Sequence, residues 1–76
     1  SVLIKDPHLD PKNIALSIRF SGSTPDGALL YWDGKPLGAA KSPFRMDKPN
    51  TGKHQIEIKD ANQNVLAHVN FVVKGL

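Results

Sequence analysis

Apolar and polar residues alternate most clearly in three stretches of this chain. In residues 14–20, IALSIRF, every second side chain is apolar, and the same period runs through residues 53–59, KHQIEIK, and residues 65–73, VLAHVNFVV. A period of two places alternate side chains on opposite faces of a β-strand. The pattern therefore predicts three half-buried strands, whose inward-facing core residues are Ile14, Leu16, Ile18, Phe20, Ile56, Ile58, Val69 and Phe71.

Turn-forming residues separate these strands from shorter ones. Residues 21–27, SGSTPDG, predict a loop, and residues 28–32, ALLYW, predict a strand that ends at Asp33-Gly34. An Asp-Gly pair accepts the positive φ angles of a tight hairpin turn, and a proline such as Pro36 confines the strand that follows to a sheet edge. Residues 60–64, DANQN, predict the last hairpin turn, because Asn and Asp side chains hydrogen-bond their own backbone.

Shorter apolar stretches at residues 2–5 and around Phe44 and Met46 complete a set of six or seven strands. No stretch has the 3.6-residue period of a helix, and no segment repeats. Short strands separated by turns predict an all-β fold in which two antiparallel sheets face each other as a β-sandwich. We expect residues 1–76 to be a single domain excised from a longer protein, since the chain begins at Ser1 without a methionine or signal peptide.

Tyr31 and Trp32, the only tyrosine and the only tryptophan, are adjacent and must point to opposite faces of their strand. Burying the larger ring removes more apolar surface from water. A chain of 76 residues without cysteine needs that contribution, because a domain this small buries only about 60% of the surface of its unfolded form. We therefore predict that Trp32 belongs to the core. Leu29 and Tyr31 then face outward.

The net charge of +3, from ten Lys and Arg against seven Asp and Glu, is spread along the chain. The basic residues occur singly, and acidic residues lie between many of them. Nucleic-acid-binding proteins instead gather basic residues on one face and add aromatic residues for stacking. The charge pattern therefore predicts a solvated surface without a nucleic-acid partner. No apolar run long enough for membrane insertion is present in the sequence.

No arrangement of ionisable residues in the sequence indicates catalysis or metal binding. The histidines, His8, His54 and His68, lack the close spacing of a zinc pair. Residues 60–64 begin like an EF-hand calcium loop, but Val65 takes the place of its required glycine. No serine lies beside an evident general base, and no glycine-rich phosphate loop follows a strand. We predict a domain that is not an enzyme and that binds no cofactor or metal.

Residues 31–38, YWDGKPLG, and residues 49–59, PNTGKHQIEIK, carry a resemblance to a known family. A tryptophan before an x-G-x-x-L-G turn, then P-x-x-G-x-H-x-I-x-I-x-D and a final apolar strand, is typical of immunoglobulin-like domains of bacterial cell-envelope proteins. The chain most closely resembles the C-terminal domain of bifunctional penicillin-binding proteins of the 1C type, over roughly residues 28–73. The family usually has a glycine in its final turn, where DANQN has none.

The resemblance implies an immunoglobulin-like antiparallel β-sandwich that serves as a non-catalytic accessory domain of a peptidoglycan synthase. Such a domain would lie in the periplasm or elsewhere outside the cytoplasm, as part of a membrane-anchored or secreted protein. It would contact a protein partner of the cell-wall machinery or peptidoglycan, or position the catalytic domains, and we expect it to be a monomer when isolated. His54 would be a half-buried structural residue, since immunoglobulin-like folds often place a tyrosine there that hydrogen-bonds to the backbone.

Alternation also indicates where a partner would bind. On the outer face of the sheet that holds the tryptophan strand and the last hairpin, it leaves Leu29, Tyr31, His68 and Val72, with Gln55 and Glu57 beside them. An exposed cluster of this kind favours a contact surface, which an adjoining domain of the parent protein would cover equally well. Two further hypotheses stay open. A carbohydrate-binding module would need an aromatic ring flat on the surface, and a structural spacer would need no partner.

Overall fold

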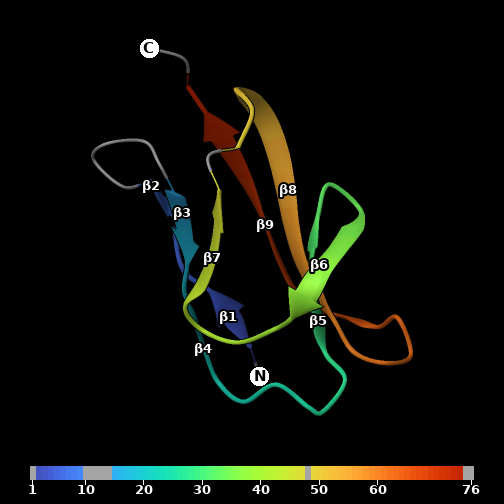
Figure 1. Ribbon diagram of the computed structural model, residues 1–76. Helices are drawn as coiled ribbons and strands as arrows, with labels where there is room; N and C mark the ends of the chain where they lie inside the picture. Colours follow the sequence, from blue (N-terminus) through green and yellow to red (C-terminus); the bar gives the residue numbers. More distant parts are fainter. Residues whose placement is uncertain (1, 10–14, 48, 75–76) are drawn as a thin grey trace.

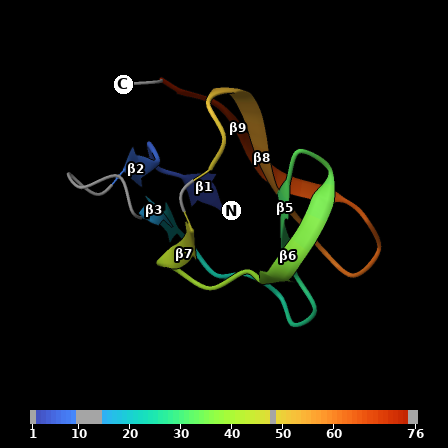
Figure 2. The same cartoon turned by 45° about the horizontal axis from the view of Figure 1, so that its top comes forward.

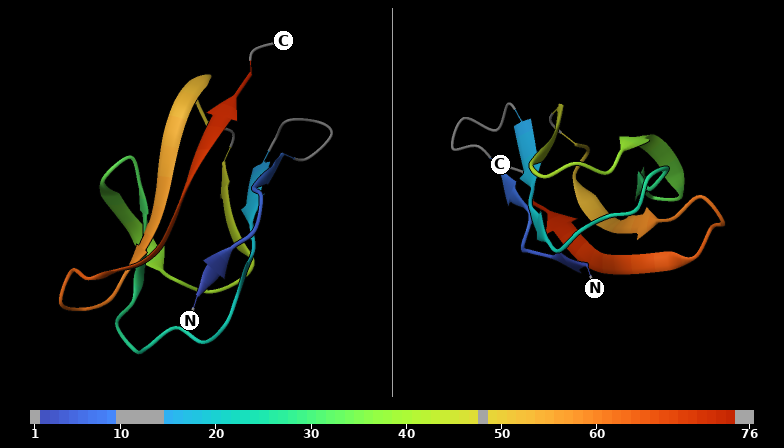
Figure 3. Two further views of the ribbon diagram at one scale, coloured as in Figure 1. Left: turned by 180° about the vertical axis from the view of Figure 1, so that it is seen from behind. Right: turned by 90° about the horizontal axis from the view of Figure 1, so that it is seen from below.

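A computed structural model of the chain describes residues 2–9, 15–47 and 49–74. Within these residues every regular element is a β-strand and every ladder is antiparallel, so the predicted fold class is confirmed. Two layers of strands face each other as an immunoglobulin-like β-sandwich (Figure 1, Figure 3). None of the described segments is a helix that could cross a membrane.

The first layer is built from five short strands. They are β1 (Leu3–Ile4), β2 (His8–Leu9), β3 (Ala15–Ile18), β4 (Phe20–Ser21) and β7 (Phe44–Asp47). Their hydrogen bonds form one pair, β1–β4, and one triplet in the order β2–β3–β7. The Lys5 N–H donates to the Arg19 carbonyl at 2.8 Å and joins the pair to the triplet. Counted as two interrupted strands, β1 with β2 and β3 with β4 bring the described total to seven, as the turn pattern predicts.

The second layer is a continuous sheet in the order β6–β5–β8–β9 (Figure 2). Its strands are β5 (Leu29–Trp32), β6 (Lys35–Ala39), β8 (Gly52–Lys59) and β9 (Val65–Val73). Asp33 and Gly34 make the predicted tight turn, with φ angles of 51° and 85°. Pro36 lies in an edge strand, as predicted, and Ile56 pairs with Val69 in the last hairpin.

The core lies between the layers and is centred on five aliphatic side chains that are fully buried. Leu16 and Ile18 come from β3, Leu30 from β5, and Ile56 and Ile58 from β8. Because both layers present alternate residues inward, the period of two found in the sequence places these side chains opposite one another.

Four other predicted core residues are only half-buried, although each packs against the central cluster: Phe20, Trp32, Val69 and Phe71. Full burial of Trp32 was therefore a wrong expectation. Its strand ends at that residue, so the ring sits at the end of the core, where fewer side chains surround it. Ile14, the remaining predicted core residue, lies outside the described residues.

We predict that Leu30→Ala lowers the free energy of unfolding by about 2–5 kcal/mol, because it leaves a cavity among fully buried neighbours. Urea unfolding followed by Trp32 fluorescence measures the change. Leu37→Ala on β6 is the matched control, since Leu37 is 44% exposed and should change stability by less than about 0.5 kcal/mol. Equal effects of the two substitutions would contradict the assignment of the core.

Candidate functional site

Asp33 ends strand β5 and continues its hydrogen-bond ladder with a side chain. The Asp33 N–H donates to the Gln55 carbonyl at 2.9 Å, and the Gln55 N–H donates to Asp33 Oδ1 at 2.8 Å. The carboxylate thereby replaces the carbonyl that one more strand residue would present to β8. The sequence had assigned Asp33 to the turn alone.

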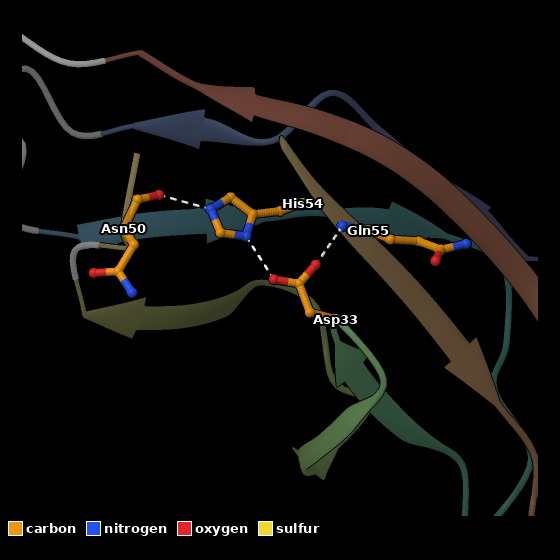
Figure 4. Close-up of polar contacts among 4 residues, drawn as sticks. All are labelled: Asp33, Asn50, His54 and Gln55. Atoms are coloured by element: carbon orange, nitrogen blue, oxygen red, sulfur yellow. Dashed lines mark hydrogen bonds and ion pairs between the residues drawn. The ribbon is translucent and has the colours of Figure 1, made fainter. Parts of the chain in front are cut away.

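The second oxygen of Asp33 binds the ring of His54 (Figure 4). His54 Nδ1 lies 2.6 Å from Asp33 Oδ2, and Nε2 lies 2.6 Å from the backbone carbonyl of Asn50. A carboxylate and a carbonyl both accept hydrogen bonds, so both ring nitrogens must carry a proton to satisfy this geometry. We conclude that His54 is an imidazolium cation. Its bond to Asn50 is a backbone tie of the kind that the tyrosine makes in immunoglobulin-like folds.

The surroundings of His54 favour the charged ring. The hydrogen bond to Asp33 raises the pKa of His54 above its ordinary 6.5, against the opposing effect of burial. The same hydrogen bond lowers the pKa of Asp33 below its ordinary 3.8. The His54 side chain is 9% exposed and stacks on Trp32, with ring centroids 4.5 Å apart and 29° between the planes. One face of the indole is therefore covered by a cation, an arrangement that the ring electrostatics favour.

Tyr31 points to the outer face of the sheet but is not exposed there. Its side chain is 7% exposed, so the expectation of an exposed Tyr31 was wrong. The Lys59 ammonium lies 4.6 Å from the ring centroid, and Gln63 Nε2 donates to the hydroxyl at 3.2 Å. Glu57 holds Lys59 in an ion pair at 3.9 Å. Long polar side chains from β8 and the last turn thus cover an aromatic ring that alternation alone leaves in solvent.

The other predicted contact residues lie on the same outer face. His68 is exposed and pairs across the ladder with Glu57, which pairs in turn with Tyr31. Leu29 is half-buried, and Val72 is 52% exposed near the end of β9. Because Tyr31 is covered and Leu29 is partly so, the four residues do not form one apolar patch.

An open groove of about 520 Å³ lies where β8 and β9 extend past the end of β5. It is lined by Asp33, Lys53, His54, Gln55, Asn70, Phe71 and Val72. Lys53 pairs with Val72, and Gln55 pairs with Asn70, so these four side chains form two adjacent rows on the outer face. Sequence reasoning had named Gln55 and Val72 but missed Lys53 and Asn70. The predicted pairing of Ile56 with Val69 already implied both cross-strand rows.

The turn at residues 60–64 uses its own acidic group. Asp60 Oδ1 accepts hydrogen bonds from the N–H groups of Asn62 and Asn64, at 2.8 and 2.9 Å. These bonds, chiefly those from Asn64, lower the pKa of Asp60. Gln63 has a φ of 69° and occupies the left-handed conformation for which the family uses glycine. Among the described residues no group of three or more His, Cys, Asp or Glu is placed to hold a metal ion.

We predict that stability is highest between about pH 4 and pH 6. Because the folded-state pKa of His54 is raised above 6.5, its contribution is complete below that value and is lost as the pH rises through the raised pKa. Because the pKa of Asp33 is lowered, its contribution is complete above 3.8 and is lost as the pH falls through the lowered value. Urea unfolding across this range, with an NMR titration of the His54 ring, measures both limbs.

Asp33→Asn should weaken both limbs of the pH profile, because an amide neither titrates nor stabilises a cation as a carboxylate does. His68→Gln is the matched control, since it removes an exposed histidine from β9 and should leave the profile unchanged. A His54 ring that titrates below 6.5 in the folded protein would overturn the imidazolium assignment.

Comparisons of the chain with protein-family models, with curated proteins and with solved structures found no match. The functional argument therefore rests on the groove, the covered aromatic rings and the residues around them.

Proposed function

We propose that this chain is a non-catalytic immunoglobulin-like accessory domain of a cell-envelope peptidoglycan synthase. In this proposal the domain contacts the cell wall or a protein of the wall machinery outside the cytoplasm, and so helps to position the catalytic domains of its parent protein. The sequence resemblance over residues 28–73 motivates the choice of family. The groove on the outer face of β8 and β9 is the observation that carries the contact function.

The groove has the chemistry of a contact site. It offers a cation at Lys53, two carboxamides at Gln55 and Asn70, and an apolar side chain at Val72. Its volume of about 520 Å³ lies within the range of binding pockets, although it is open on one side. Carboxamides that face solvent both donate and accept hydrogen bonds, and the lysine adds attraction for carboxylates. Peptide and acetamido groups, together with carboxylates, would be complementary to this lining.

The covered aromatic rings argue against a carbohydrate-binding module. Such a module needs a ring lying flat and free on the surface, but Trp32 stacks on His54, and Tyr31 lies under Lys59 and Gln63. Exposing either ring would break one of these contacts. A contact made through polar side chains in the groove needs no such rearrangement.

We predict that the double variant Lys53→Ala/Gln55→Ala binds isolated peptidoglycan sacculi, or a cross-linked envelope partner, about tenfold more weakly than the wild type. Both residues lie on the central strand β8, and Lys53 and Gln55 are exposed, so the variant should stay folded. Co-sedimentation with sacculi tests the wall, and cross-linking in envelope membranes tests protein partners.

Lys35→Ala on β6 is the matched control, because it removes the same charge at an exposed position away from the groove. Equal losses in Lys35→Ala and in the double variant would attribute binding to the net charge of +3 and reject the groove. No binding to sacculi and no cross-linked partner would reject the contact function and favour a structural spacer.

A further inference from the structure

The two edges of the four-stranded sheet differ in their protection against other strands. At one edge, β6 has five residues and contains Lys35, Pro36 and a register shift opposite Leu30 and Tyr31. Charge, proline and bulges are the devices by which proteins prevent an edge strand from pairing with another chain. The β6 edge therefore has three of these devices within five residues.

At the other edge, β9 lacks these devices along most of its length. It is nine residues long, and its sequence VLAHVNFVV contains no proline, no glycine and no Lys, Arg, Asp or Glu. One register shift, opposite Ile58 and Lys59, interrupts only its beginning. Within the described residues β9 is hydrogen-bonded to β8 alone. A long and uncharged edge strand is a template for a further strand.

Strand β1 lies alongside β9 without pairing with it (Figure 3). Its residues Leu3 and Ile4 pair with Ser21 and Phe20 of β4, so the backbone of β1 belongs to the other layer. Leu3 and, on β9, Val65 and Val72 are exposed large apolar side chains. Three of the four such residues found in the described chain thus lie on β9 or on the strand beside it.

The order of residues on β9 is complementary to itself. On its outer face, exposed valines lie near both ends, at positions 65 and 72, and polar His68 and Asn70 lie between them. In an antiparallel pair centred on Val69, His68 of one copy lies opposite Asn70 of the other. Val72 then falls beside Val65 of the other copy, because the register shift moves Val65 into the position that Leu66 would hold.

We propose that two copies of this chain associate through antiparallel pairing of their β9 edges, making one continuous sheet across a two-fold axis. Charge favours a second copy as the occupant. The protein is basic overall, and β9 is the sheet edge that brings no Lys or Arg against its own image. The proposal departs from the expectation of a monomer and is independent of the groove and of the proposed function.

Sedimentation velocity over a concentration series tests the association. The apparent mass of the wild type should rise from that of one chain toward that of two, and Val72→Lys should raise the dissociation constant by about tenfold, since it places a lysine at two symmetric contacts. Leu37→Lys on β6 is the matched control, because it adds the same charge at an exposed apolar residue of the opposite edge. The control should associate like the wild type.

Disulfide cross-linking tests the register, and the chain has no cysteine of its own to interfere. In a mixture of Val65→Cys and Val72→Cys proteins, a heterodimer should form under mild oxidation, because paired residues bring their Cβ atoms close enough for a disulfide. Val72→Cys alone should form far less. A wild type that stays monomeric at every concentration, or an association weakened equally by Leu37→Lys, would overturn the proposal, and a monomer would leave the β9 edge to a strand from another protein.

Discussion

The contact between Leu16 and Ile18 of one layer and Leu30, Ile56 and Ile58 of the other is the interaction on which the rest of this structure depends. These are the side chains that lose their whole surface on folding. The chain has no cysteine, so no disulfide supports the two layers. Strand β8 supplies two of the five residues and pairs with strands on both sides. The remaining strands are held against this centre by their ladders and by half-buried rings at its ends.

The same alternation that buries Ile56 and Ile58 sends His54 inward at the end of the core. A nearly buried ring with two polar nitrogens costs free energy unless both nitrogens are hydrogen-bonded. Asp33 and the carbonyl of Asn50 meet that need, and because both are acceptors the ring takes a second proton. The clamp connects the β5–β6 turn to the segment before β8. The charge on His54 is thus a consequence of where the strand pattern places it.

The two adjacent aromatic residues show how a small fold uses large side chains. Trp32 closes the end of the core and lies against His54, while Tyr31 on the other face lies under Lys59 and Gln63. Neither ring is left free for stacking on a ligand. The surface that remains for contacts is made of lysine, carboxamide and valine side chains in the groove and of the backbone of β9.

The sequence by itself determined the all-β class, the strands, the Asp33-Gly34 turn, the edge position of β6 and the register of the last hairpin. These features depend on local periodicity and on turn residues, which neighbouring positions carry. Only the tertiary structure decided that Asp33 meets His54, that Tyr31 is covered, and that Lys53 and Asn70 line a groove. The contacts of Asp33 and Tyr31 join residues more than twenty positions apart through the pairing of β5 with β8 and the fold of the last turn. Alternation tells which face a side chain takes, but what covers that face depends on which strands become neighbours.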